Sequence, residues 1–428
     1  MKLKSLHIDS YRHLENVSFD FTYPEGHAKA GKPLDKICII GQSATGKTGV
    51  LELIKDSFIS LDALEIVNNK YLFNQFVLGA GFKGNLEYLT QNGFLEIAEN
   101  KVIKDGKEFS FGSVSGSLEK LVRDNLKLLY LSSEIISKET ISILNQNPLN
   151  IINEISKEKY EGFDRKYSAP NYIYEFVQNV NEEIWFYLLY KILDYRKRFM
   201  QMASELINKG VIGNANKLNN EYATWSKAND NPIELFANNF NPVLKKLNLE
   251  IDLVNTEYSI PVKSKVNDEI IPVSGLSTGT KGLLLSMFPL FELDTTDAII
   301  LLDEPERSLF PDMQIDLMGH YQNLAPDAQF IVATHSPFIA AAFEPEERFI
   351  LYFDQKGKVA VRRGESPIGD DPNDILRNDF NVDYYNDFGK KAYKEYLDLK
   401  RKVSQETQAE KKKELIVELA GLGDKYNF

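Results

Sequence analysis

Three short runs of apolar residues predict buried strands in this chain. The runs lie at 37–40, 299–302 and 330–333, and none of them alternates between apolar and polar positions. Continuous apolar runs of this length are typical of parallel strands that are covered on both faces of a sheet. A glycine-rich segment follows the first run, a pair of carboxylates the second and a histidine the third. We therefore expect a parallel sheet whose carboxyl edge carries a functional site.

The other patterns predict an antiparallel region and a helical region. Between Asn85 and Ser110, three short segments are separated by Asn-Gly and Asp-Gly turns, which favour hairpins. The stretch from Ala169-Pro170 to about Lys209, which Gly210 ends, has the pattern of one long helix. A second helical segment, from about Ala215 to Ala228, could run back against it.

A polar, turn-rich segment up to Pro372 precedes a helix from about Asp387 to Leu422, which carries one apolar stripe. The fold class that these patterns predict is α/β. We divide the chain into a first lobe with an antiparallel section, a helical insert, a second lobe and a helical tail, with the bounds 1–137, 138–247, 248–365 and 366–428.

The composition, 43% hydrophobic and 26% charged, is ordinary for a soluble globular protein. No apolar run reaches the length of about 18 residues that a membrane span requires, and the first residues lack the apolar segment of a signal peptide. Cys38 is the single cysteine, so no internal disulfide can form and a cytoplasmic location is expected. The net charge of −12 argues against indiscriminate DNA binding, although it permits docking to a basic partner.

A complete P-loop follows the first apolar run. Its residues are Gly41, Gln42, Ser43, Ala44, Thr45, Gly46, Lys47 and Thr48, and Gly49 begins a helical pattern that extends to Ser60. In a strand, loop and helix of this kind, backbone amides and the helix N-terminus surround a phosphate. Lys47 would bridge the β- and γ-phosphates of ATP, and Thr48 would hold Mg²⁺. A chance glycine-rich turn is the alternative, and the agreement of both flanks argues against it.

Asp303 and Glu304 follow the second apolar run and are typical of a Walker B strand, which Pro305 ends. Asp303 is expected to orient Mg²⁺ or its water, and Glu304 to polarise the attacking water. An acidic N-cap on the next helix is the alternative. His335, after the third run, would bond the γ-phosphate and sense its loss, whereas an isolated histidine would be an ordinary core or surface residue.

The segment 276–282, Leu-Ser-Thr-Gly-Thr-Lys-Gly, opens a helix ahead of the Walker B strand. Ser277, Gly279 and the backbone amides of this turn could form a second anion site that faces the ATP of a partner subunit. In isolation the same residues would be an ordinary N-cap. Their position before the Walker B strand favours the trans-acting signature.

Together, the four motifs resemble ABC-type P-loop ATPases of the broad group that contains the SMC, RecF and OLD proteins. The resemblance covers roughly 1–135 and 250–380 and includes the opening segment from Leu6 to Leu14. Because the arginine of that segment approaches the nucleotide in such proteins, Arg12 is a candidate contact. The signature departs from the transporter form Leu-Ser-Gly-Gly-Gln, and Phe310 stands where the group often has histidine.

A finer resemblance is to ATPase subunits of bacterial anti-phage systems, such as AriA of PARIS and PtuA of Septu and retron systems. Its grounds are the short helical insert, the His-Ser-Pro after the third apolar run and the segment from Gly369 to Leu376. The resemblance implies a Mg²⁺-dependent ATPase that closes head to tail as a dimer or higher homo-oligomer and holds a separate toxin or nuclease effector. The alternative is a RecF-like repair clamp on duplex DNA, and a transporter subunit would need separate membrane chains.

The position of the Q-loop is left open. Gln75 is a candidate for the glutamine that reaches Mg²⁺ and the attacking water in many ABC ATPases. The segment 128–134 fits better by position but contains no glutamine, so Ser133 or Glu134 could stand there.

Overall fold

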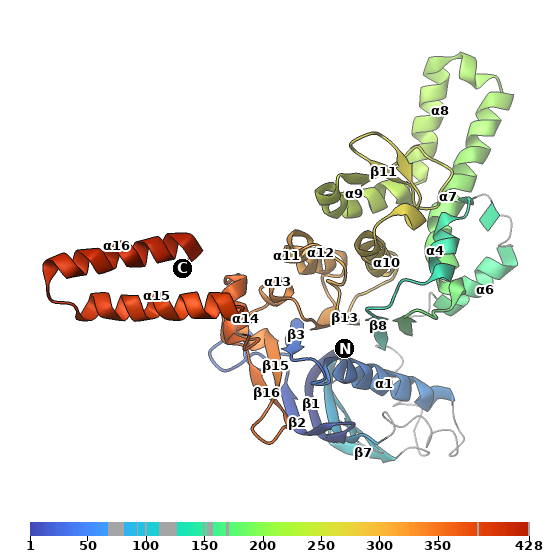
Figure 1. The fold of residues 1–428 in the computed structure, drawn as a ribbon. Helices are drawn as coiled ribbons and strands as arrows, with labels where there is room; N and C mark the ends of the chain where they lie inside the picture. The colour runs from blue at the N-terminus through green and yellow to red at the C-terminus, as the bar shows by residue number, and fades with distance from the viewer. Residues whose placement is uncertain are drawn as a thin grey trace.

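The computed structural model describes residues 1–66, 81–91, 93–98, 101–110, 126–148, 150–151, 157–167, 171–382 and 385–426. These residues form a body of sheets and helices, from which the helical hairpins α7/α8 and α15/α16 project in different directions (Figure 1). No helix within the described ranges is both long and apolar enough to cross a membrane.

A mostly parallel sheet forms the centre of the body. Its strands, in spatial order, are β16 (Val359–Arg363), β15 (Arg348–Phe353), β3 (Lys36–Gly41), β14 (Gln329–Ala333), β13 (Ile299–Asp303), β8 (Lys127–Leu131) and β9 (Tyr172–Phe176). Edge strand β16 pairs antiparallel with β15, and the remaining pairs are parallel. The three apolar runs are the adjacent strands β3, β14 and β13, in which Ile39, Ala333 and Asp303 are in register. The predicted parallel sheet with a shared carboxyl edge is therefore confirmed.

An antiparallel sheet shares one apolar core with helix α1 (Lys47–Ile66) and with one face of the parallel sheet. Its strands, in spatial order, are β2 (Leu14–Asp20), β1 (Lys2–Tyr11), β4 (Lys83–Thr90), β5 (Gly93–Ala98), β6 (Lys101–Lys104) and β7 (Lys107–Ser110). This arrangement confirms the predicted antiparallel region and adds β6 to the three expected segments. Phe58 of α1 meets Tyr88 of β4 edge to face, with ring centres 5.6 Å apart, which fixes the helix against the antiparallel sheet.

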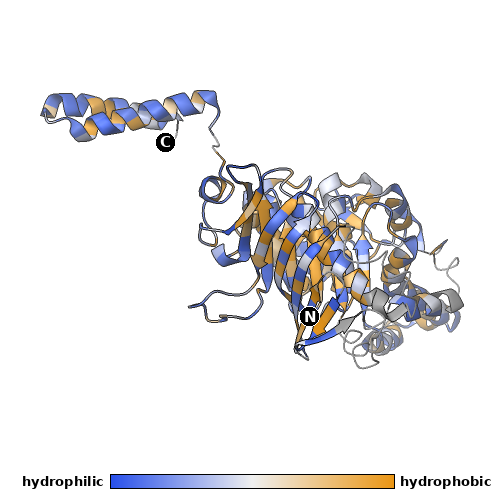
Figure 2. Ribbon diagram, turned by 90° about the horizontal axis from the view of Figure 1, so that it is seen from below, coloured by the Kyte–Doolittle hydropathy of each residue, from blue (hydrophilic) through white to orange (hydrophobic). Residues whose placement is uncertain are grey.

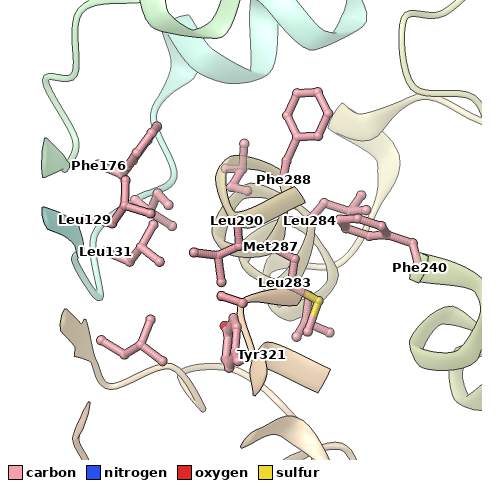
Figure 3. Close-up of a cluster of buried hydrophobic side chains, with 14 of the residues drawn as sticks. Leu129, Leu131, Phe176, Phe240, Leu283, Leu284, Met287, Phe288, Leu290 and Tyr321 are labelled. Carbon is pink, nitrogen blue, oxygen red and sulfur yellow. The ribbon is translucent and has the colours of Figure 1, made fainter. Parts of the chain in front are cut away.

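The opposite face of the parallel sheet is covered by helix α10 (Thr278–Glu292) and its neighbours. Leu283, Leu284 and Met287 of α10 are buried among side chains from β8, β9 and the helices around it (Figure 3). Figure 2 shows the apolar residues gathered along the strands of the body. The sheet is thus apolar on both faces, which explains why its central strands have unbroken apolar runs.

Further elements are helices, a small sheet and 3₁₀ turns. The helices are α4 (Lys138–Asn145), α6 (Lys157–Tyr167), α7 (Glu182–Asn208), α8 (Ala215–Ala228), α9 (Pro232–Leu244), α11 (Pro311–Ile315), α12 (Leu317–Leu324), α13 (Pro337–Ala340) and α14 (Pro372–Asn378). A small antiparallel sheet contains β10 (Leu249–Ile251), β11 (Val262–Ser264) and β12 (Ile270–Ile271). Short 3₁₀ turns lie at Val211–Gly213, Lys245–Leu247, Val273–Gly275 and Pro345–Glu347.

The predicted long helix from Ala169-Pro170 is wrong at its start. Residues 168–170 lie outside the described part, and 172–176 form β9, which extends the parallel sheet beyond β8. The segment Tyr-Ile-Tyr-Glu-Phe is rich in aromatic and β-branched residues, which favour a strand. Helix α7 begins at Glu182 because the Asn181 side chain caps it by accepting a hydrogen bond from the Glu183 amide at 2.9 Å. Its predicted end is confirmed, since Gly210 follows in the left-handed conformation at φ 67°.

The predicted single tail helix is also wrong, because the tail is a hairpin of α15 (Asp387–Gln405) and α16 (Ala409–Tyr426). Glu406 adopts an extended conformation, and its side chain accepts a hydrogen bond from the Gln408 amide at 2.8 Å. The stripe residues Ala392 and Leu399 are buried. Phe388, at the start of the stripe, is 82% exposed, so only part of the stripe is a packed face.

A fully buried ion pair joins the residue after α14 to the parallel sheet. The Arg348 Nε of β15 lies 2.9 Å from the Asp379 Oδ2 after α14, and neither side chain is exposed. We expect Asp379→Ala to lower the free energy of unfolding by about 3–5 kcal/mol, because Arg348 would remain charged and buried without its partner. Urea unfolding measures the change. The control is Asp398→Ala, which removes the exposed ion pair with Arg401 and should lower the free energy of unfolding by less than about 1 kcal/mol. An equally small decrease for Asp379→Ala would contradict the prediction.

Candidate nucleotide site

The P-loop joins the carboxyl end of β3 to the first turn of α1, as the sequence predicts. A β-carbon added to Gly41 would lie 2.2 Å from the Leu351 carbonyl oxygen, so no side chain fits there. Ala44 and Gly46 have positive φ values of 65° and 94°, which curl the loop. Gln42, Ser43 and Ala44 are exposed, whereas Thr45 is buried and donates its hydroxyl to the Gln42 carbonyl at 2.8 Å. The loop therefore presents an exposed backbone arch at the sheet edge, which is the form of a phosphate site.

Lys47 lies over this arch. Its ammonium donates to the carbonyl oxygens of Gly41 at 3.0 Å and Gln42 at 3.1 Å, and the side chain is largely buried. Burial lowers the pKa of Lys47, and the carboxylates of Glu304 and Asp303 oppose that shift. The charge is thus held at the position where a bound phosphate would meet it.

Thr48 and Asp303 meet across the space between α1 and β13. The Thr48 hydroxyl lies 3.1 Å and 3.2 Å from the two carboxylate oxygens of Asp303. Burial raises the pKa of Asp303 to about 6, and the Thr48 hydrogen bond opposes that shift. A hydroxyl and a carboxylate are hard oxygen ligands, and Mg²⁺ typically binds one or two carboxylates together with phosphate oxygens. The residues present therefore fit Mg²⁺ bound with ATP.

Glu304 and His335 face each other at the ends of neighbouring strands. The His335 Nε2 lies 3.7 Å from the Glu304 Oε1, and both side chains are about two fifths exposed. Glu304 is held in the left-handed conformation at φ 48°, with its amide donating to the Ala333 carbonyl at 2.8 Å. Burial lowers the pKa of His335, the nearby Lys47 charge lowers it further, and the Glu304 carboxylate opposes these shifts. The structure thus brings together the two residues that the sequence assigns to water activation and phosphate sensing.

Arg12 lies beside the first turn of α1. It is in the turn between β1 and β2, and its guanidinium forms an ion pair with Glu52 at 2.6 Å. A β-carbon on Gly49 would lie 3.5 Å from the Arg12 guanidinium, and one on Gly46 would lie 3.1 Å from the His13 Nε2. This turn therefore packs against the P-loop through both side chains, and His13 is a neighbour of the loop that the sequence analysis did not identify.

Ser277 is the N-cap of α10. Its hydroxyl accepts a hydrogen bond from the Thr280 amide at 3.2 Å and lies 2.8 Å from the Thr280 hydroxyl. The side chains of Ser277 and Thr278 are nevertheless exposed. These contacts are made within α10 and not with the P-loop of the same chain. The capping role and a signature role for a second subunit are therefore compatible.

Gly279 packs against the turn that follows the Walker B strand. A β-carbon there would lie 2.4 Å from the Ser308 carbonyl oxygen and 3.0 Å from the Leu309 Cδ2. We expect Gly279→Ala to lower the free energy of unfolding by about 1–3 kcal/mol, because one of the two turns must move. Gly282→Ala on the same helix is the matched control, since nothing lies within 4 Å of its β-carbon position. The control should be neutral or stabilising by up to about 1 kcal/mol, and equal effects of the two changes would contradict the assignment.

A cavity of about 410 Å³ lies between the carboxyl ends of β13 and β8 and the first turns of α10. Asp303, Glu304, Ser133 and Glu134 line it, and so does Gln178, which follows β9. Gln75 lies outside the described residues. Sequence reasoning missed Gln178 because the stretch around it was assigned to a helix, and the aromatic strand pattern before it was the signal available.

Glu306 is a second residue that the sequence did not single out. One of its carboxylate oxygens accepts hydrogen bonds from the Thr334 hydroxyl at 2.7 Å and the His335 amide at 2.9 Å. Burial raises the pKa of Glu306, and these two hydrogen bonds oppose that shift. Glu306 therefore joins the turn that carries Glu304 to the turn that carries His335.

No curated protein matches the sequence. Among solved structures, the chain is similar to an SMC head bound to the C-winged helix domain of ScpA (12% identity over 85% of this chain and 97% of that chain, TM-score 0.43). It is also similar to the SMC head domain from Thermotoga maritima (13% identity over 86% of this chain and 100% of that chain, TM-score 0.39). A third similar structure is an Smc head domain with an extended coiled coil bound to the C-terminal domain of ScpA derived from Pyrococcus furiosus (14% identity over 85% of this chain and 96% of that chain, TM-score 0.41).

The AAA ATPase domain family matches residues 1–340, which is 340 of the 428 residues. With the sheet order and the P-loop described above, this match confirms the predicted α/β fold class of a P-loop ATPase. Every proposed site residue from Arg12 to His335 lies inside the matched segment. The chain belongs to the AAA ATPase domain family.

Proposed function

We propose that this ATPase hydrolyses Mg²⁺-bound ATP in a head-to-tail dimer, and that it controls a separate toxin or nuclease effector of a bacterial anti-phage system. The observation that carries the dimer is the exposure of the signature turn. Lys47, Thr48, Asp303, Glu304 and His335 gather at one edge of the sheet, whereas the signature turn at Ser277 is exposed and bonds within its own helix. A second copy would bring its signature turn to the phosphates held by the first.

The side chains of this chain divide the work of hydrolysis. The P-loop amides and Lys47 would bind the β- and γ-phosphates, and Thr48 with Asp303 would hold Mg²⁺, which supplies positive charge to the phosphate oxygens. Glu304 would accept a proton from the attacking water, while His335 would hydrogen-bond the γ-phosphate. Gln178, Ser133 or Glu134 would line the approach of that water.

The effector part of the proposal is supported by the projecting tail. The α15/α16 hairpin stands away from the site (Figure 1), and it exposes Phe388 at 82% and Val417 at 72%. Apolar side chains on an extended hairpin are suited to contact with another subunit. The buried Arg348–Asp379 pair holds the end of α14, which precedes the hairpin in the chain, against the parallel sheet.

Co-purification tests the proposal. Tagged Glu304→Gln, expressed with its neighbouring genes and kept in ATP and Mg²⁺, is examined by native mass spectrometry. A stoichiometric complex with a nuclease or toxin subunit would support the effector role and give the assembly size. A bare ATP-dependent dimer that shifts duplex DNA in a salt-sensitive manner would favour the repair clamp instead. A monomer in saturating ATP would contradict the dimer itself.

A further inference from the structure

The side chain of Gln314 on α11 joins the turn that carries His335 to the far end of the turn that packs on the signature, while Glu306 joins the near end. Its Oε1 accepts a hydrogen bond from the Ser336 hydroxyl at 2.6 Å. Its Nε2 donates to the Leu309 carbonyl at 2.8 Å. The Gln314 side-chain amide thus accepts a hydrogen bond from one turn and donates a hydrogen bond to the other.

Each end of this connection belongs to a turn that is held by further hydrogen bonds or close packing. Ser336 follows His335 directly and caps α13, accepting hydrogen bonds from the Phe338 and Ile339 amides at 3.1 Å and 3.2 Å. Since these amides donate to the Ser336 oxygen, the hydroxyl hydrogen is free to point at Gln314. A displacement of His335 would therefore move the Ser336 hydroxyl, which donates a hydrogen bond to Gln314.

The other end reaches the signature. Leu309 is buried, and its Cδ2 and the neighbouring Ser308 carbonyl lie 3.0 Å and 2.4 Å from the β-carbon position of Gly279. That close packing leaves little room for the Ser308–Leu309 turn to move without moving the first turn of α10. The path from His335 to Ser277 is thus a continuous series of hydrogen bonds and close contacts.

We propose that Gln314 is a positioning residue that couples the His335 turn to the signature turn of the same chain. The inference rests on the proposed head-to-tail dimer, in which the two turns serve different ATP molecules. His335 would report the state of the chain's own site, and Ser277 would act on the partner's site. Gln314 then makes hydrolysis at one site depend on occupancy of the other.

Gln314→Glu tests this coupling with almost no change in shape. A carboxylate can still accept from the Ser336 hydroxyl, but it cannot donate to the Leu309 carbonyl. We expect the Hill coefficient for ATP hydrolysis to fall from a value approaching 2 in the wild type to about 1, since the coefficient is bounded by the number of coupled sites. ATP affinity, measured by equilibrium binding to dilute protein, should change by less than about threefold. A general loss of structure would instead weaken ATP binding, so this measurement distinguishes lost coupling from misfolding.

Gln322→Glu, the same change on neighbouring helix α12, is the matched control and should keep the wild-type Hill coefficient. Gln314→Leu, which loses both hydrogen bonds, is the second variant if the glutamate destabilises the fold, and it should show the same loss of cooperativity. Melting temperatures of all variants identify any that fail to fold. An unchanged Hill coefficient in folded Gln314→Glu and Gln314→Leu would overturn the coupling role.

Failure of the dimer and failure of the coupling give different results. If Glu304→Gln stays monomeric in ATP, the proposed function fails, and hydrogen exchange in the first turn of α10 then tests the connection within one chain. ATP should change that exchange in the wild type and leave it unchanged in Gln314→Glu. If the dimer forms but the Gln314 variants hydrolyse ATP as cooperatively as the wild type, the dimer stands and the coupling is wrong.

Discussion

Lys47→Ala is expected to weaken ATP binding by about a hundredfold or more, because it removes a charged hydrogen-bond donor from a buried position over the P-loop. The methyl group of alanine supplies neither the charge nor a donor for the β- and γ-phosphates. Equilibrium binding of a fluorescent ATP analogue in Mg²⁺ measures the effect. Hydrolysis should fall at the same time.

The control for this change is Lys29→Ala, which removes an exposed lysine that pairs with Asp35 at 2.6 Å. It leaves the P-loop unchanged and should bind the analogue like the wild type. The Lys47 variant should also unfold at a similar temperature, since its ammonium bonds only loop carbonyls in the structure. Tight ATP binding by a folded Lys47→Ala protein would show that the phosphates are held elsewhere.

The central sheet and the phosphate site could be predicted because their signals are local. Each apolar run is continuous and its functional residue follows within two positions, so each strand and its chemistry are contained in the same few residues. The glycine positions of the P-loop are equally local, since Gly41 and Gly46 are required by the backbone conformation of the loop itself. These are the positions at which local sequence and overall fold agree.

Residues whose role depends on distant partners could not be predicted. Glu306 lies 29 positions from His335 and Gln314 lies 22 from Ser336, and no periodicity connects either pair. Strand β9 was mistaken for the start of a helix because it forms a strand only by pairing with β8. The partner of Tyr172 in β8 is Lys127, which lies 45 positions earlier in the chain. The break between α15 and α16 was missed because three polar residues interrupt an otherwise helical pattern without glycine or proline. Tertiary contacts, rather than local preference, decide these elements.

Glu304→Gln is expected to lower the rate of ATP hydrolysis by about a hundredfold or more while leaving ATP binding intact, since removal of a general base typically costs a factor of about 10²–10⁴. The amide keeps the shape of the side chain and can still lie near the His335 Nε2, now 3.7 Å from the carboxylate. It cannot accept the proton of the attacking water. Single-turnover release of phosphate measures the chemical step directly.

The same variant separates the base from the remaining carboxylates of the site. Because ATP would bind and not be cleaved, the proposed dimer should persist in Glu304→Gln and dissociate within minutes in the wild type, which size-exclusion chromatography in Mg²⁺ and ATP can follow. Asp312→Asn, a change of the same kind at an exposed carboxylate on α11, should hydrolyse ATP at the wild-type rate. If Glu304→Gln turns over normally, the base is another group, and Glu134 in the shared cavity becomes the first residue to replace. If hydrolysis stops and no dimer accumulates, Glu304 is the base and the exposed signature turn serves some purpose other than closure on ATP.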